Sequence, residues 1–214
     1  IVYTASVTNP AETDFTVNLS NGQSIVIAAH TSSASITVAA PSDDPYVDGS
    51  TTSTTITGTS GGNFENLLVG AGGTLSPVLT TVTDTADTTV VTLSASAGSV
   101  TEGGTITYTA SVNNPVTGSD LIVTLTGGVT ITIPVGSSSA NSTAVATRSD
   151  EAYLQGTDTI TKAITGTSGG NFEALTTTST VSTSVVDDAD TTVVTLSASA
   201  GSVTEGGTIT YTAS

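Results

Sequence analysis

The stretch DTTVVTLSASAGSVTEGGTITYTAS, residues 87–111, recurs without a change 103 positions later as residues 190–214. A second block, GTSGGNFE, occupies residues 58–65 and returns 108 positions later as residues 166–173. Two repeats with nearly the same spacing indicate an array whose unit is about 105 residues long. This unit is too long for a solenoid repeat, and it fits an immunoglobulin-like β-sandwich of roughly 100 residues.

Within the complete unit, apolar and polar residues alternate, as expected for half-buried β-strands. Leu121, Val123 and Leu125, for example, fall on one face of a single predicted strand. The links Gly127-Gly128 and, in the first copy, Asn21-Gly22 are signals of tight hairpins. We predict seven strands in this unit, at residues 89–96, 105–112, 121–126, 129–135, 141–147, 158–165 and 178–186.

The predicted fold class is therefore all-β, with tandem immunoglobulin-like β-sandwich domains of about seven strands arranged end to end. Residues 1–86 form a repeat that lacks its first strand and ends in a linker at residues 84–87. Residues 87–189 form a complete repeat that ends in a linker at residues 187–190. Residues 190–214 hold the first strands of a further repeat.

The first repeat begins inside a strand. Ile1 aligns with Ile106 and Ile209, so residues 190–208 have no counterpart at the head of the chain. We expect either that the chain is a section of a longer array or that the ends of neighbouring molecules complete one another.

The composition excludes several classes of function. Eighteen acidic residues stand against two basic ones, Arg148 and Lys162, and the net charge of −16 excludes binding to nucleic acid or to an anionic membrane surface. There is no Cys and only one His, His30, so disulfides, thiolate zinc sites and multi-histidine metal centres are excluded. No run of about 18 apolar residues exists, so we expect no membrane insertion. Arg148 and Lys162 have no charged counterparts in the first copy, and we expect them to be incidental surface charges.

The acids gather in particular loops. Because successive strands alternate in direction, the first, third and fifth loops lie at the end of a unit where its last strand exits, and the other loops lie at the opposite end. Sixteen of the 18 acids fall in loops or linkers where one unit would meet the next, and only Asp48 and Asp158 lie elsewhere. The candidate metal ligands at the exit end are Asp43, Asp44, Asp84, Asp87, Glu102, Asp150, Glu151, Asp187, Asp190 and Glu205. Those at the entry end are Glu12, Asp14, Asn63, Glu65, Asp120, Asn171 and Glu173.

Carboxylates crowded beside a short linker repel one another unless a cation neutralises them. Ca²⁺ takes six to eight oxygen ligands from carboxylates, amides and backbone carbonyls without strict geometry, whereas Mg²⁺ demands octahedral order and keeps its water. The expected cofactor is therefore Ca²⁺, with Mg²⁺ as the weaker candidate. The alternative is that these acids occupy loops only because loops face water.

Three resemblances to known families rest on particular residues. Glu102, the acidic pair before the sixth strand and the Asp-x-x-Asp linker resemble the ligand layout of cadherin repeats, and VTEGGTITY at residues 100–108 resembles the start of Calx-β modules. The GTSGGNFE block, the DDADTT linker at residues 187–192 and the Cys-free, Thr/Ser/Val-rich composition resemble the tandem extender repeats of large bacterial RTX adhesins of the LapA type. This last resemblance covers essentially the whole chain.

The resemblance to LapA-type repeats implies an immunoglobulin-like sandwich with Ca²⁺ at the domain junctions. It implies an extracellular stalk that projects a distal adhesive region from a bacterial cell surface. The expected partners are then neighbouring repeats of the same chain, and this segment itself would not contact the adhesion target. The longer linker motif of cadherins and the calcium-binding nonapeptides of RTX proteins are absent from this sequence.

Other functions remain as alternatives. A ligand- or carbohydrate-binding adhesin module usually exposes aromatic residues, but the chain has three Phe and five Tyr. Tyr46 and Tyr153 lie just before the sixth strand, where a tyrosine corner is expected. Thr-x-Thr patterns prompt ice binding, although Thr is also favoured on the solvent side of strands. An enzyme is the least favoured class, because no base is available to activate a Ser or Thr except His30, which has no counterpart in the second copy.

Overall fold

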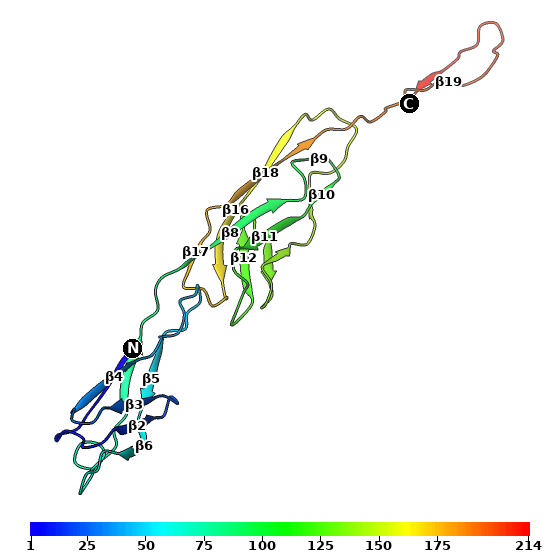
Figure 1. The fold of residues 1–214 in the computed structure, drawn as a ribbon. Coiled ribbons are helices and arrows are strands. Elements are labelled where there is room, and N and C mark those ends of the chain that lie inside the picture. Colours follow the sequence, from blue (N-terminus) through cyan, green and yellow to red (C-terminus); the bar gives the residue numbers. More distant parts are fainter. The chain divides into compact units, whose positions relative to one another are not determined.

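The computed structural model describes residues 1–214 and contains only β-strands, turns and loops. It divides into two compact units (Figure 1). The first unit consists of Ile1–Thr88 together with Phe172–Ala174, and the second consists of Thr89–Asn171 and Leu175–Ser214. The predicted all-β fold class is confirmed. No helix is present that is long and apolar enough to cross a lipid bilayer.

The second unit is built from two main sheets. One has the strand order β14-β11-β8-β17 and the other has the order β13-β12-β16-β18-β9, while β10 and β15 form a short additional pair. The strands are β8 (Thr88–Ala95), β9 (Ser99–Thr101), β10 (Thr105–Ile106), β11 (Tyr108–Val112), β12 (Leu121–Leu125), β13 (Thr130–Ile133), β14 (Ser139–Asn141), β15 (Val145–Ala146), β16 (Asp158–Ser168), β17 (Ala174–Thr176) and β18 (Thr180–Val186).

Alternation along these strands builds the core. In β12, Leu121, Val123 and Leu125 are buried while Ile122 between them faces outward. In β8, the buried residues are Thr89, Val91 and Leu93, and they come from every second position. One face of each strand is therefore apolar and packed, and the other carries mostly Thr and Ser.

The seven predicted strands are all present, with two differences. Two predicted strands are broken, the one at 105–112 into β10 and β11 and the one at 141–147 into β14 and β15, and two further short strands, β9 and β17, extend the sheets. β9 pairs in parallel with β18, with Val100 opposite Val185. The hairpin between β12 and β13 turns at Gly127 and Gly128, whose φ angles of 83° and 79° suit glycine.

The first unit follows this plan with fewer strands, and it has no strand that corresponds to β8, β9, β10, β15 or β17. Its sheets have the orders β1-β4, β3-β2-β6 and β5-β7. β5 and β6 together correspond to the single long strand β16 of the second unit, and Thr55 separates them. The strands are β1 (Val2–Ser6), β2 (Phe15–Leu19), β3 (Ser24–Ile27), β4 (Ser33–Thr37), β5 (Ser50–Thr54), β6 (Ile56–Gly61) and β7 (Val78–Val82).

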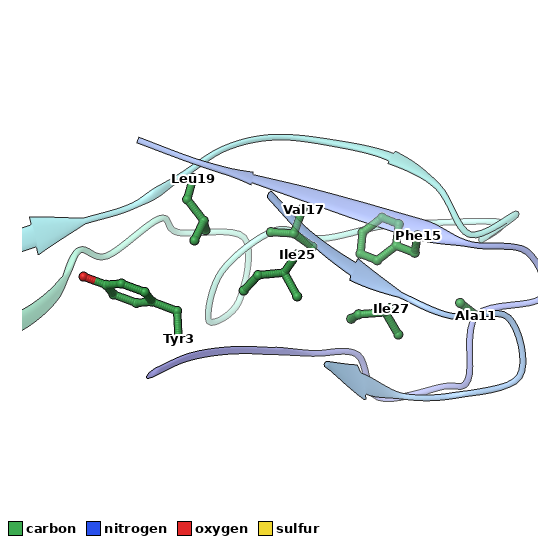
Figure 2. Close-up of a cluster of buried hydrophobic side chains, with 7 residues drawn as sticks. All are labelled: Tyr3, Ala11, Phe15, Val17, Leu19, Ile25 and Ile27. Atoms are coloured by element: carbon green, nitrogen blue, oxygen red, sulfur yellow. The ribbon is translucent and has the colours of Figure 1, made fainter. Parts of the chain in front are cut away.

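Figure 2 shows the core of the first unit, in which the buried side chains form a row between the strands. Phe15 also meets Phe64 edge to face, with ring centroids 5.3 Å apart. The Tyr3 hydroxyl accepts a hydrogen bond from Thr54 Oγ1 at 3.0 Å. The row consists of Tyr3, Ala11, Phe15, Val17, Leu19, Ile25 and Ile27.

The tyrosine-corner prediction is wrong for Tyr153, because this side chain is 75% exposed and cannot lock a corner. The ring of Tyr46 instead packs against Phe172 at a centroid distance of 5.6 Å. The sequence pattern placed both residues correctly in the loop before the sixth strand, but loop position alone does not direct a ring inward.

Residues 190–214 form a hairpin of β19 (Leu196–Ala198) and β20 (Tyr211–Ala213), paired from Leu196↔Ala213 to Ala198↔Tyr211. Its apolar side chains are open to water, with Val193, Val194 and Leu196 exposed by 68%, 79% and 73%.

Candidate metal centre

Three loops of the second unit bring carboxylates together. Oxygens of Glu102, Asp150 and Asp188 all lie within 4.8 Å of one another. Glu102 follows β9, Asp150 lies between β15 and β16, and Asp188 follows β18. The parallel pairing of β9 with β18 fixes this arrangement, since the Glu102 backbone NH donates to the Val186 carbonyl at 3.0 Å.

Gly103 lets the loop of Asp150 approach Glu102. Its φ is 68°, and a Cβ built on it would lie 2.8 Å from the Cβ of Asp150, closer than a methyl group can pack. The Gly103 NH also donates to the Arg148 carbonyl at 2.8 Å. Steric crowding against Asp150 therefore explains why glycine follows Glu102 in the sequence.

Arg148 is not an incidental surface charge, and that prediction is wrong. Its Nε donates to Glu102 Oε2 at 2.9 Å, and its guanidinium lies 3.6 Å from Asp187 Oδ1. It also donates to the Gly156 carbonyl at 2.7 Å. One guanidinium thus holds two of the carboxylates in place.

One Arg does not neutralise the whole cluster. Glu102 is 4% exposed, and its second oxygen, Oε1, is buried without a hydrogen-bond partner. The hydrogen bond from Arg148 lowers the pKa of Glu102, but desolvation and the neighbouring Asp187 outweigh it, so the pKa of Glu102 is raised. Desolvation and the charges of Asp188, Asp150 and Asp187 likewise raise the pKa of Asp190.

Asp187 behaves differently from its neighbours. The Gln155 backbone NH donates to Asp187 Oδ2 at 2.9 Å, and this bond, followed by the contact with Glu102, lowers the pKa of Asp187. Asp187 is thus held as the charged member of its pair with Glu102.

The first unit carries a second group of acids. The Asp48 backbone NH donates to Asp84 Oδ2 at 3.0 Å, and the Asp87 NH donates to Glu173 Oε2. The other oxygen of Glu173, Oε1, is buried without a hydrogen-bond partner.

The pKa shifts in this group follow the same causes. The backbone bond from Asp48 lowers the pKa of Asp84. The bond from Asp87 lowers the pKa of Glu173, but desolvation and Asp84 outweigh it and raise that pKa. Desolvation, followed by Asp44 and Asp84, raises the pKa of Asp48.

Other predicted ligands serve as loop braces. Asp14 Oδ1 and Asp120 Oδ1 each accept a backbone NH across the unit at 2.9 Å, from Ala29 and Val135 respectively. Asp44 Oδ1 accepts the Tyr46 NH at 2.9 Å.

Two further contacts join predicted ligands to side chains: Asp43 accepts the Thr85 hydroxyl, and Glu12 accepts the side-chain amide of Asn63. Asn171 packs beside Gly118, where a Cβ would lie 2.9 Å from its own. Glu65, Glu151 and Glu205 are exposed and lie outside the three-carboxylate cluster.

Two acids in these groups are missing from the predicted ligand set. Asp188 joins Glu102 and Asp150; it belongs to the acidic exit linker of the sequence but was not in the predicted ligand set, and its counterpart in the first copy is Thr85. Asp48 was placed outside the acidic loops, yet its backbone binds Asp84. The sequence feature that could have identified Asp188 is the concentration of Asp residues at positions 187–190.

The cluster of Glu102, Asp150 and Asp188 has the features of a metal site. It presents only oxygen atoms, it is strongly negative, and it contains a buried carboxylate oxygen with no partner. A buried unsatisfied carboxylate oxygen is costly, and a cation would satisfy it. The residues present therefore fit a hard metal ion.

Comparison with known proteins gives a family match. The model of the family described as LapA domain matches residues 1–85 and 87–189. No curated protein and no solved structure matches the chain.

The pKa shifts predict how stability depends on pH in metal-free buffer. The folded-state pKa values of Glu102 and Glu173 lie above 4.5, and those of Asp48 and Asp190 lie above 3.8. The folded chain therefore binds more protons than the unfolded chain above these values, and the free energy of unfolding falls as the pH rises. The melting temperature in EDTA should be higher at about pH 5 than at about pH 7.5.

The lowered pKa values of Asp84 and Asp187 act in the opposite sense at lower pH. These two carboxylates add to the free energy of unfolding at pH values above their ordinary pKa of 3.8. This stabilisation is lost as the pH falls through their folded-state pKa values. Melting curves across the whole range should thus show a maximum in the mildly acidic region. A melting temperature that falls steadily from neutral to mildly acidic pH would contradict the raised pKa values assigned to these four carboxyl groups.

Proposed function

The chain belongs to the LapA domain family, and we propose that it is a structural extender segment of a bacterial cell-surface adhesin, stiffened by Ca²⁺ bound among its acidic loops. The observation that carries this proposal is the group of three carboxylates within 4.8 Å of one another, with the buried Glu102 Oε1 unpartnered. In this role the chain acts as an extracellular spacer that holds a distal adhesive region away from the cell.

Calcium suits this donor set better than the other common ions. The group offers carboxylates alone, without the Cys or multiple His residues that zinc and other transition metals prefer. Glu102, Asp150 and Asp188 would hold the ion, and Arg148 keeps Glu102 oriented by binding its other oxygen. The bound cation would supply positive charge and oxygen coordination to loops that otherwise repel one another.

The loops concerned come from positions that adjoin the linkers. Asp188 lies within the linker 187–190, and in the first unit Asp84 and Asp87 delimit the linker 84–87. A cation that ties a linker carboxylate to Glu102 and Asp150 restricts the backbone that leads to the next repeat. An array of such joints would be stiff with calcium and flexible without it.

A carbohydrate-binding module is less well supported. Tyr3, Phe15 and Tyr108 are buried, Phe64 meets Phe15, and Tyr46 meets Phe172. The remaining aromatic residues, Tyr153 and Tyr211, are exposed but belong to separate segments, so they do not form an aromatic platform. Catalysis is likewise not part of the proposal, since His30 lies in a turn with a φ of 65° and its counterpart in the second copy is Gly136.

Calcium should raise the melting temperature of the chain through this site. Extracellular calcium modules have Kd values of about 10⁻⁴–10⁻³ M, so about 10 mM calcium adds about 1.4–2.7 kcal/mol to the free energy of unfolding. For a unit of this size the shift is about 6–20 °C, measurable by calorimetry in calcium against EDTA. Glu102→Gln should remove this shift from the transition of the second unit.

The matched control is Glu151→Gln, which removes one charge from the residue next to Asp150 but lies outside the cluster. Its calcium-induced shift should equal that of the unchanged chain. Equal calcium-induced shifts in Glu102→Gln and the unchanged chain would place the bound ion elsewhere. Because each variant is compared with itself in calcium and in EDTA, a general loss of stability does not obscure the result.

Stiffening is tested separately by small-angle X-ray scattering. In calcium, the distribution of interatomic distances should be extended and sharply bounded; in EDTA, the scattering should show the spread of shapes typical of a flexible linker. Identical profiles in the two buffers would refute the stiffening role even if calcium binds.

A further inference from the structure

Arg148 contacts three segments at the acidic end of the second unit. Its Nε donates to Glu102 Oε2 at 2.9 Å, and its Nη2 donates to the Gly156 carbonyl at 2.7 Å and lies 3.6 Å from Asp187 Oδ1. Its own backbone carbonyl accepts the Gly103 NH at 2.8 Å. One residue thus joins the loop after β9, the loop before β16 and the linker that follows β18.

The guanidinium leaves the rest of the carboxylate cluster without a cation. It binds Oε2 of Glu102, whereas Oε1 of the same side chain is buried without a hydrogen-bond partner. The ion pairs of Arg148 are with Glu102 and Asp187, and none is formed with Asp150 or Asp188. The Glu102 carboxylate therefore has one oxygen bound to a fixed cation and one oxygen available to a further cation.

The charge of Arg148 is permanent and weakly screened. A guanidinium does not lose its proton in proteins. Glu102 is 4% exposed, and the side chain of Arg148 is 21% exposed, so water and salt screen the pair much less than they screen a surface pair. Any ion that joins Glu102 must therefore bind against the electrostatic repulsion of this charge.

Given the calcium site proposed for Glu102, Asp150 and Asp188, we propose that Arg148 is a built-in counter-ion that sets the calcium affinity of that site. Without calcium, the guanidinium partly neutralises Glu102 and Asp187 and holds their loops together. When calcium binds, the same charge repels the ion, so the site fills at a higher calcium concentration than it would without Arg148. The residue thereby sets the calcium concentration at which the chain stiffens.

Two opposing effects of Arg148 on calcium binding differ in size. Even at the dielectric constant of water, a unit charge about 6 Å from a divalent ion changes its Kd by about tenfold, and in a less polar surrounding the change is larger. Arg148 also orients the Glu102 side chain, and the loss of one ordered side chain weakens binding by about fivefold. The backbone of Glu102 stays fixed without Arg148, because its NH donates to the Val186 carbonyl at 3.0 Å. The effect of the charge is therefore the larger one.

The metal-free chain should respond to the loss of Arg148 in the opposite direction. Removing one partner of a buried ion pair leaves an uncompensated charge, which strongly destabilises a fold. Glu102 would then face the surrounding aspartates with no cation, and the Gly156 carbonyl would lose its donor. Loss of Arg148 should therefore lower the melting temperature in EDTA while it tightens calcium binding. A residue with a purely structural role would lower both the stability and the calcium affinity when it is replaced.

Calorimetric titration of the full chain with calcium, at about 0.15 M salt, measures this affinity. Arg148→Met removes the charge and keeps an unbranched side chain, and its Kd for calcium should be lower than that of the unchanged chain by about tenfold or more. Its melting temperature in EDTA should be lower as well. The matched control is Lys162→Met, which removes the other basic side chain of the same unit, whose Nζ donates to the Thr126 carbonyl at the hairpin between β12 and β13. Its calcium Kd should stay within about twofold of the unchanged value.

Two further variants locate the effect and keep the test valid if Arg148→Met fails to fold. In a chain that already carries Glu102→Gln, Arg148→Met should change the remaining calcium binding by less than about twofold, because the affected site has been removed. Arg148→Lys keeps the positive charge with fewer hydrogen bonds. Its calcium Kd should stay within about threefold of the unchanged value, although its melting temperature in EDTA falls.

Weaker calcium binding by Arg148→Met would assign Arg148 a purely structural role and overturn the inference, and a loss of calcium binding by Arg148→Lys would do the same. Equal tightening by Lys162→Met and Arg148→Met would be a general effect of net charge and would also overturn it. Calcium binding with the same Kd in the unchanged chain and in Arg148→Met overturns the inference but leaves the proposed calcium site in place. Calcium binding in neither chain refutes both.

Discussion

Repulsion between the buried carboxylate of Glu102 and the acids around it, of which Asp150 and Asp188 are exposed, is the constraint on which this protein depends. Glu102 is almost fully enclosed, faces Asp150, Asp188 and Asp187, and receives a single guanidinium from Arg148. The energetic cost of such a group is high in a low-dielectric surrounding and falls when a positive ion or a proton enters. Arg148 lowers the pKa of Glu102, but desolvation and Asp187 outweigh it and raise that pKa.

The strands explain why the charge collects at these loops. Their outward faces carry mainly Thr and Ser, and their inward faces carry Val, Ile and Leu, so the sheets themselves contribute almost no charge. The parallel pairing of β9 with β18 then brings Glu102 to the end of the last strand of the unit, where the linker begins. In a chain without Cys, an ion at this position would take the place of a disulfide as the cross-link between loops.

The sequence predicted the sheets better than it predicted the site. Regular alternation, as in Leu121, Val123 and Leu125, located the main strands. β9 and β17 were missed because three-residue strands are too short to show a period, and their pairing depends on tertiary contacts.

The site prediction rested on loop position, which identifies a loop rich in acids but not the direction of a side chain. Asp14 and Asp120 therefore brace backbones, while Asp188 joins the cluster without support from the other copy. Arg148 was misjudged for a different reason: it has no charged counterpart in the first copy and was therefore predicted to be incidental, although it contacts both Glu102 and Asp187.

The most direct measurement is long-wavelength anomalous diffraction from crystals of the chain grown in calcium. The account predicts an anomalous peak about 2.3–2.6 Å from carboxylate oxygens of Glu102, Asp150 and Asp188. A well-ordered map of these three side chains that contains water and no anomalous signal would contradict it.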